Sequence, residues 1–453
     1  MLIILGITLM TFFGFLISLA LIGKMRAIER VGISFLLGVG VFTFLMFCYS
    51  TLGVKITLIS TLVALIIFNC LAYLLVRILH RKIYLKVGVR DVINNMSRLE
   101  KILVGVIGAL GIASLVVTVY YPVNIWDALA LYDFRAKVIF DTGYFTQIAR
   151  NYYYFVQYPL FTSLSHTFVY IFGVKNPQFI YSFLYLSFLF AFYGALAEFV
   201  RRKIALVSTA LLASTPVLFE HSTFAYTNLP YAIFISLGTI YLYIWIIKGR
   251  KTGYLILSAL MMGLSTWTRA SEPFWAVGFF AVIVYSIYRY IKYRDSILSP
   301  VWYFLTFFPI KEIWAKIYFE LLNGPSSTVS LLSAEITSHK NALFNVALNF
   351  EKLTEVLIFI WKFVVVTWYP ISILFVLCLA LNLKNILRKP STMFLVFILL
   401  HFALLIYGTY IFSSNVYWNS IPDSARRLAM FFLPLMLFHV GLSVGEISTK
   451  ISK

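Results

Sequence analysis

Polar residues concentrate in one segment of an otherwise apolar chain, between Tyr121 and Phe161. Asp127 is the first carboxylate of this segment and directly follows Trp126. A carboxylate within hydrogen-bond reach of a hydroxyl can accept its proton as a general base. Because charge held at a membrane face costs free energy unless it is used, Asp127 is the leading catalytic candidate. The structural alternative is that Asn124 caps a helix and Asp127 favours its dipole from the first turn.

Positive charges that could bind a phosphate lie near the ends of apolar stretches. Arg426 and Arg427 precede the last such stretch, and guanidinium groups bind phosphate through paired hydrogen bonds, although an interfacial anchor would explain one arginine. Arg269 and Glu272 carry the whole charge of a short turn, either as an ion pair or, for Arg269, as a contact to a phosphate or acceptor. Lys362 begins another stretch and either extends its amine to the membrane surface or reaches the same phosphate.

Four further residues are substrate-binding candidates. Asp133 lies four residues before Lys137, a spacing that also suits a solvated ion pair on a helix. Tyr158 stands at the end of the polar segment, and Glu220 is followed by His221. The Glu-His pair is only a weak metal candidate, since neither an Asp-x-Asp pair nor a His/Cys/carboxylate set with metal-ligand spacing occurs. We therefore expect no metal and no cofactor.

The composition places the chain in a lipid bilayer. It has 453 residues, of which 61% are hydrophobic and 12% charged, with a mean hydropathy of +0.91. Soluble domains carry roughly 25% charged residues. Alternating ten-residue segments of the barrel type are absent, so we expect an all-α, polytopic membrane protein. Thirteen spans are expected, near residues 2–22, 32–50, 56–76, 102–121, 177–199, 204–219, 229–247, 253–268, 273–290, 297–310, 363–383, 393–412 and 428–445.

The net charge of +20 is distributed unevenly between the two sets of loops that join the expected spans. Alternate loops between the expected spans hold roughly two thirds of the lysines and arginines, which is the positive-inside asymmetry. It predicts an integral protein of the cell membrane with the amino terminus outside and the carboxyl terminus in the cytoplasm. Because the basic residues mark topology, we expect the lipid bilayer as a partner and no nucleic acid.

The polar outer face is where function is expected. Its long segments are 122–176, 311–362 and 413–427, whereas residues 1–100 form three spans and a basic cytoplasmic loop. The first outer segment is predicted to contain two amphipathic interfacial helices, Ile125–Phe140 and Leu160–Phe172. In the first of them, one 120° arc of an ideal helix collects the apolar residues, and Asp127, Asp133 and Lys137 fall on the opposite side.

An ordered series of motifs resembles the GT-C glycosyltransferases, polytopic enzymes that use polyprenyl-phosphate sugars, such as protein mannosyltransferases and lipid A aminoarabinose transferases. The resemblance spans roughly residues 100–445 and makes residues 101–453 the catalytic module. The motifs, in order, are Trp126-Asp127-Ala128, Gly143-Tyr144-Phe145, Tyr158-Pro159-Leu160-Phe161, Tyr226-Thr227-Asn228-Leu229-Pro230 and Arg426-Arg427 with Pro434.

The resemblance implies an inverting transfer of a sugar from a polyprenyl-phosphate carrier to a glycan, glycolipid or protein acceptor at the outer face. An acidic residue of the first outer loop is the catalytic base in that family, and Asp127 matches it. Basic residues near the late spans hold the lipid phosphate, which implies Arg426 or Arg427. One position departs from the family pattern: Asn228 stands where the pattern Tyr-x-Asp-x-Pro has a carboxylate.

Two other functions compete with this interpretation. A transporter or flippase of lipid-linked saccharides would place ionisable residues in the middle of several spans, often in paired repeats. An O-antigen ligase or polymerase type of transferase would keep its activity when Asp127 is changed to Asn, but lose it with changes to outer-loop Arg or His residues.

Overall fold

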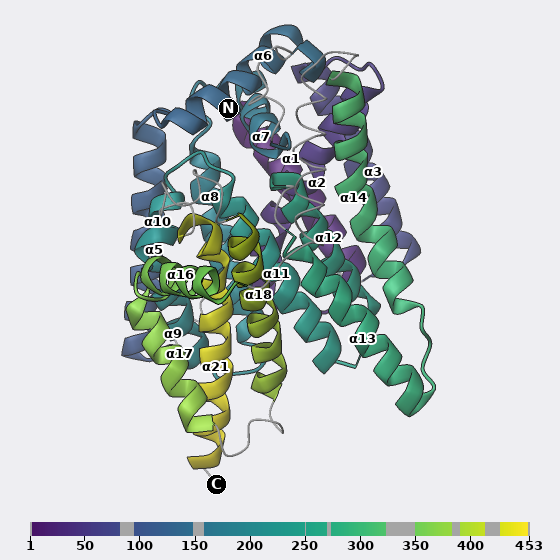
Figure 1. Cartoon of the computed structure of the whole chain (residues 1–453). Helices are drawn as coiled ribbons and strands as arrows, with labels where there is room; N and C mark the ends of the chain where they lie inside the picture. Colours follow the sequence, from purple (N-terminus) through teal and green to yellow (C-terminus); the bar gives the residue numbers. More distant parts are fainter. Residues whose placement is uncertain are drawn as a thin grey trace.

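The fold is all-helical, as expected. The computed structural model describes residues 2–81, 95–147, 158–249, 251–269, 273–322, 349–382, 390–412 and 426–451, and every regular element in these ranges is a helix. Most helices run in one general direction, and the chain ends lie toward opposite ends of the molecule (Figure 1).

Eight helices in the described ranges are long and apolar enough to cross a membrane. A helix crosses the hydrocarbon with about 20 residues, so this chain is an integral membrane protein. The eight are α1 (Leu2–Leu21), α2 (Ala27–Thr51), α3 (Leu58–Ile78), α5 (Arg98–Tyr120), α8 (Phe179–Leu196), α11 (Asn228–Ile247), α18 (Pro390–Phe412) and the last helix, which begins at Arg426 and contains α21 (Phe432–Ile451).

The expected number of thirteen spans is not confirmed. The stretch 204–219 forms two short helices, α9 (Arg202–Ala213) and α10 (Pro216–His221), because Pro216 cannot continue the α9 hydrogen-bond ladder and starts a new helix. The stretch 363–383 belongs to a pair of helical segments bent by 105°, which raises the number of spans to nine if the pair is one span.

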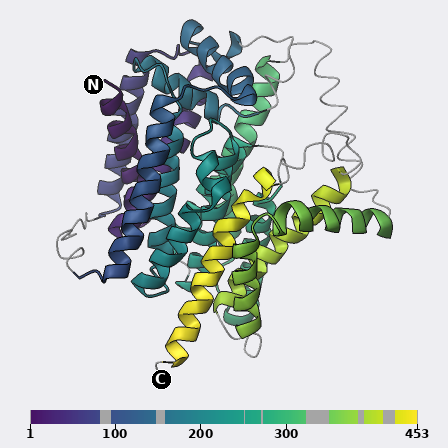
Figure 2. The same ribbon diagram turned by 90° about the vertical axis from the view of Figure 1, so that its left-hand side faces the viewer.

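Five further helices are each too short or too polar to meet the same criterion by themselves. These helices are α12 (Thr252–Thr268), α13 (Trp275–Tyr293), α14 (Ser299–Leu322), α16 (Phe350–Ile360) and α17 (Tyr369–Asn382). In Figure 2, α16 runs across the direction of the last helix. It is amphipathic and leads through a π-helical turn, η4 (Trp361–Val365), into the bend before α17.

The first two helices approach closely through glycine. A Cβ atom on Gly14 would lie 1.9 Å from the Ser34 carbonyl oxygen, and one on Gly38 would lie 2.2 Å from that of Met10. Small residues allow such backbone contact between membrane helices, whose association depends on packing. Because α2 also packs along α8, the first three spans are joined to the rest of the bundle.

The described part of segment 122–176 contains helices at both expected places, and the first of them is irregular. The segment begins with a π-helix, η1 (Ala128–Asp133), continues as α6 (Phe134–Thr142) and η2 (Phe145–Gln147), and includes α7 (Phe161–Ile171). A π-helix turns less per residue than the ideal helix assumed from the sequence, and Asp133 is therefore buried instead of solvated. The second expected helix is present as α7, and it is buried along most of its length where it packs against α2 and α6.

Gly143 fixes the end of α6. Its φ of +80° is favourable for glycine, and its carbonyl oxygen accepts a 2.8 Å hydrogen bond from the Ile56 amide. The outer segment is thereby held to the connection between α2 and α3.

Candidate active site

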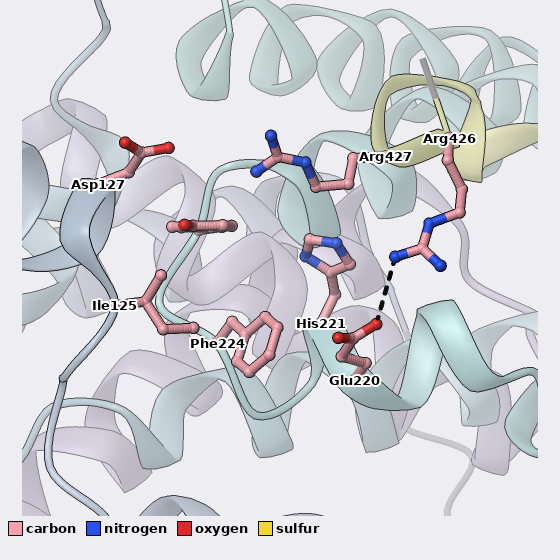
Figure 3. Close-up of a pocket in the computed structure, with 8 residues that line it drawn as sticks. Ile125, Asp127, Glu220, His221, Phe224, Arg426 and Arg427 are labelled. Carbon is pink, nitrogen blue, oxygen red and sulfur yellow. Dashed lines mark ion pairs between the residues drawn. The ribbon is translucent and has the colours of Figure 1, made fainter. Parts of the chain in front are cut away.

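A cavity of about 290 Å³ brings together side chains from three distant parts of the sequence (Figure 3). It lies where the chain leaves α5, where α10 ends and where the last helix begins. Its lining residues are Ile125, Asp127, Glu220, His221, Phe224, Tyr226, Arg426 and Arg427. Five of the ten site residues predicted from the sequence are therefore neighbours in space.

Asp127 presents its carboxylate to this cavity. The chain turns after Tyr121, helical structure resumes at Trp126, and Asp127 has helical backbone angles of φ −61° and ψ −38°. Its side chain is half-buried and makes no capping hydrogen bond. In Figure 3 the carboxylate points toward the guanidinium group of Arg427. The residue is placed to receive a proton from a molecule in the cavity.

Arg426 and Arg427 enter the cavity from the first turn of the last helix. Nη2 of Arg426 lies 3.8 Å from Oε2 of Glu220, and the Arg427 guanidinium carbon lies 5.5 Å from the centre of the Tyr226 ring. A helix amino terminus carries partial positive charge and disfavours cations by about 0.3–1 kcal/mol each. The helix dipole therefore does not favour the two arginines at this position. An anion bound beside them would offset this unfavourable placement.

α10 and the turn after it form the aromatic wall of the cavity. Pro216 suits the first position of a short helix, and that helix ends with Glu220 and His221. The buried His221 ring lies 5.7 Å from the Phe224 ring and 6.0 Å from the Tyr226 ring, centre to centre. Within the described ranges, no three His, Cys, Asp or Glu side chains are arranged to hold a metal ion.

Asp133, another predicted site residue, lies in a buried network apart from the cavity lining. Its carboxylate accepts hydrogen bonds from Nδ1 of His166 at 3.1 Å and from the Tyr170 hydroxyl, and it pairs with Nζ of Lys137 at 2.8 Å. Burial alone would raise the pKa of Asp133, but the donors outweigh it and hold the pKa below its ordinary value. This network joins η1 to α7, which gives Asp133 a structural role.

Arg269 and Tyr158 lie beside each other but do not line the cavity. The Arg269 guanidinium carbon is 5.6 Å from the centre of the Tyr158 ring, and Nη1 donates a 3.4 Å hydrogen bond to Oγ1 of Thr227. The Tyr158 carbonyl accepts a 2.8 Å hydrogen bond from the buried Arg135. Since Thr227 follows Tyr226, Arg269 is hydrogen-bonded to the residue next to a lining side chain.

Of the last two predicted site residues, Lys362 does not line the cavity. Lys362 is exposed in η4, with Nζ 5.3 Å from the centre of the Phe363 ring. Glu272 lies outside the described residues.

Three lining residues, Ile125, Phe224 and Tyr226, were not predicted as site residues. Each is apolar or aromatic in a chain that is 18% aromatic, so residue type alone does not distinguish them. The available signal was their position, close to Asp127 or to the Glu220-His221 pair.

Comparison with protein-family models, with curated proteins and with solved structures finds no match to this chain. The basis for assigning a function is therefore the residues and the geometry of the cavity.

Proposed function

We propose that this integral membrane protein is a glycosyltransferase that moves a sugar from a polyprenyl-phosphate carrier to an acceptor at the outer face of the cell membrane. The supporting observation is that one carboxylate, Asp127, and two guanidinium groups, Arg426 and Arg427, share a single cavity. The acceptor is a hydroxyl of a glycan, glycolipid or protein.

The proposed reaction is a single displacement. The acceptor oxygen attacks the anomeric carbon while its proton passes to the Asp127 carboxylate. The bond between the anomeric carbon and the phosphate oxygen breaks, and its electron pair leaves with the polyprenyl phosphate. Arg426 and Arg427 stabilise the charge that grows on this phosphate. Attack on the face opposite the leaving group inverts the anomeric configuration.

The dimensions of the cavity support a small sugar phosphate as the ligand. Its volume of about 290 Å³ lies at the lower limit of the ~300–1,000 Å³ typical of ligand pockets. In Figure 3, Asp127 and Arg427 enter the cavity from different sides and point toward one another. The positive charge in this mechanism comes from arginine, and no resident cofactor is invoked.

The outer face is supported by the charge asymmetry of the loops. The cavity is built from segments that the positive-inside rule assigns to the side with fewer basic residues. A donor carried by a lipid also suits a membrane-embedded enzyme, because the prenyl chain can remain among the helices while its head enters the cavity.

Transport is less well supported by the position of the charges. In the eight membrane-crossing helices of the described ranges, every Lys, Arg, Asp and Glu lies within four residues of a span end, and the histidines nearer the middle are His401 and His439, in two neighbouring helices only. A transport pathway needs ionisable groups deeper in several spans. A ligase-type transferase would use the same arginines, and it differs from our proposal in not needing Asp127.

The test compares wild type with Asp127→Asn and a matched control, Asp141→Asn, in the same outer segment. Asp141 is exposed and does not line the cavity. Purified protein in vesicles is supplied with short-chain polyprenyl-phosphate sugars and a membrane extract as acceptor, and sugar transfer is measured. We expect a loss of roughly 10²–10⁴-fold for Asp127→Asn, the usual contribution of a general base, and none for Asp141→Asn.

The other outcomes decide between the functions. Transfer that survives Asp127→Asn but is lost with Arg427→Gln refutes the base and favours the ligase type. Movement of the lipid-linked sugar across the bilayer, with no transfer in any variant, favours a transporter.

A further inference from the structure

Glu220 occupies a site where a ligand phosphate would otherwise meet Arg426. Both side chains line the cavity, and Oε2 of Glu220 lies 3.8 Å from Nη2 of Arg426. The side chains are 44% and 34% exposed, so a molecule entering the cavity meets this pair directly. Figure 3 shows Arg426 turned toward Glu220, whereas Arg427 extends toward Asp127.

The proposed chemistry gives Glu220 no role in proton transfer. The lining contains two guanidinium groups and two carboxylates, and Asp127 accounts for one carboxylate as the base. Glu220 supplies the other negative charge beside the very groups that would attract a phosphate. A carboxylate in this place weakens anion binding unless it serves to discriminate between anions.

We propose that Glu220 selects the charge of the lipid head group. By pairing with Arg426, it leaves the direct contact with the bound donor to Arg427, and Arg426 acts only on the charge that grows during transfer, so that the cavity accepts a phosphodiester with one negative charge and disfavours a diphosphate. This inference rests on the proposed function, because it concerns the phosphate of the same donor, and it makes Glu220 a specificity-determining residue.

The physical reason is competition between two anions for one guanidinium. A diphosphate carries additional negative charge and needs a second cation close by, which in this cavity is Arg426. It must therefore displace Glu220 or remain close to its carboxylate, and both cost free energy. A diester has no such requirement and leaves the pair intact. Partly exposed ion pairs contribute modestly, so we expect Glu220 to shift the preference by roughly fivefold.

The experiment measures binding of two probes that share one prenyl chain: farnesyl methyl phosphate, a diester, and farnesyl diphosphate. Each is titrated against the full chain in lipid nanodiscs, and the ratio of the two dissociation constants is the readout. The variants are Glu220→Gln, the double variant Glu220→Gln with Arg426→Gln, and Glu312→Gln. Glu312 pairs with Lys311 and does not line the cavity, so its variant controls for the change in net charge.

We expect wild type to prefer the diester and Glu220→Gln to shift the ratio about fivefold toward the diphosphate. The double variant should lose this shift because the Arg426 guanidinium is gone, and Glu312→Gln should keep the wild-type ratio.

Equal ratios in wild type and Glu220→Gln, with both probes bound, overturn the charge-selection role and leave the proposed function intact. Failure of wild type and all variants to bind either probe above protein-free nanodiscs overturns phosphate binding at the cavity, and with it the proposed function.

Discussion

Arg427 and Tyr226 together shape the side of the cavity that we propose binds phosphate. The guanidinium group lies against the aromatic face at 5.5 Å, a cation–π contact that limits where the planar group can turn. Two donor groups of the guanidinium can then face a phosphate from a fixed direction. A lysine cannot reproduce this arrangement, because its ammonium is a point charge on a flexible stem.

We therefore predict a graded effect of substitutions at Arg427. Arg427→Lys keeps the charge and should lower kcat/KM for the lipid-linked sugar about tenfold, whereas Arg427→Gln should lower it roughly 10²–10³-fold, as removal of a transition-state donor does. Transfer kinetics in vesicles measure both. Arg289→Gln is the control, since Arg289 pairs with Asp295 away from the cavity lining. Equal losses for Lys and Gln would contradict the requirement for paired donors.

At the residue scale, charge in an apolar chain was the informative signal. It identified Asp127, Arg426 and Arg427, which come together in the structure. The same signal selected Asp133, which is instead held in the interior by His166. Sequence spacing gives the type of a residue but not the side to which a distorted helix turns it.

At the scale of elements, the network around Asp133 holds η1 against α7. Two donors and one ammonium satisfy a carboxylate whose side chain is only 2% exposed. Removing one partner of a buried charged group leaves the others unsatisfied. Asp127 immediately precedes η1, so the network anchors the element that follows the proposed base.

We predict that Asp133→Asn destabilises the outer segment by about 2–4 kcal/mol. Hydrogen–deuterium exchange across residues 128–142 should report it, and Asp141→Asn, on the exposed side of α6, should show no comparable change.

The stabilisation by the Asp133 network should depend on pH. The folded pKa of Asp133 is lowered, so its contribution is complete above the unfolded pKa of about 3.9 and is lost as the pH falls below it. Protection factors, which correct for the intrinsic exchange rate at each pH, should therefore fall below this pH more in the wild type than in Asp133→Asn. Parallel pH profiles would contradict the network.

The elements themselves were only partly predictable. Hydropathy located the long spans, because an unbroken run of about 20 apolar residues is typical of a helix that crosses the hydrocarbon. It did not reveal the break at Pro216 or the 105° bend before α17, since apolar composition continues through both. The π-helix η1 was also missed, because a regular period of 100° per residue was assumed where the backbone departs from it.

At the scale of the whole molecule, the orientation of the chain in the membrane decides on which side the cavity lies. The basic residues that follow the positive-inside rule predict that the end of α5 faces outward and the start of α9 faces the cytoplasm. The fold class and membrane location were predictable from composition, whereas the number of spans was not, because several helices are too short or too polar to be assigned by hydropathy.

The orientation can be tested with single cysteines and a membrane-impermeant maleimide, after replacing the three native cysteines. Trp126→Cys, at a residue that is 76% exposed, should react in intact cells. Arg201→Cys, at the exposed start of α9, should react only after permeabilisation. The reverse pattern would place the cavity on the cytoplasmic side.

In the proposed transfer, the arginines at the start of the last helix have a kinetic consequence. When a phosphodiester gives up its sugar, the remaining carrier gains negative charge, so these cations hold the spent lipid more firmly than the incoming one. Turnover is then governed by how long the used carrier stays, and the first cycle outpaces those that follow. Glu220 can pair with Arg426 again after transfer, which shortens the time for which the used carrier stays bound. The side chain proposed to select the donor would therefore also speed release of the product.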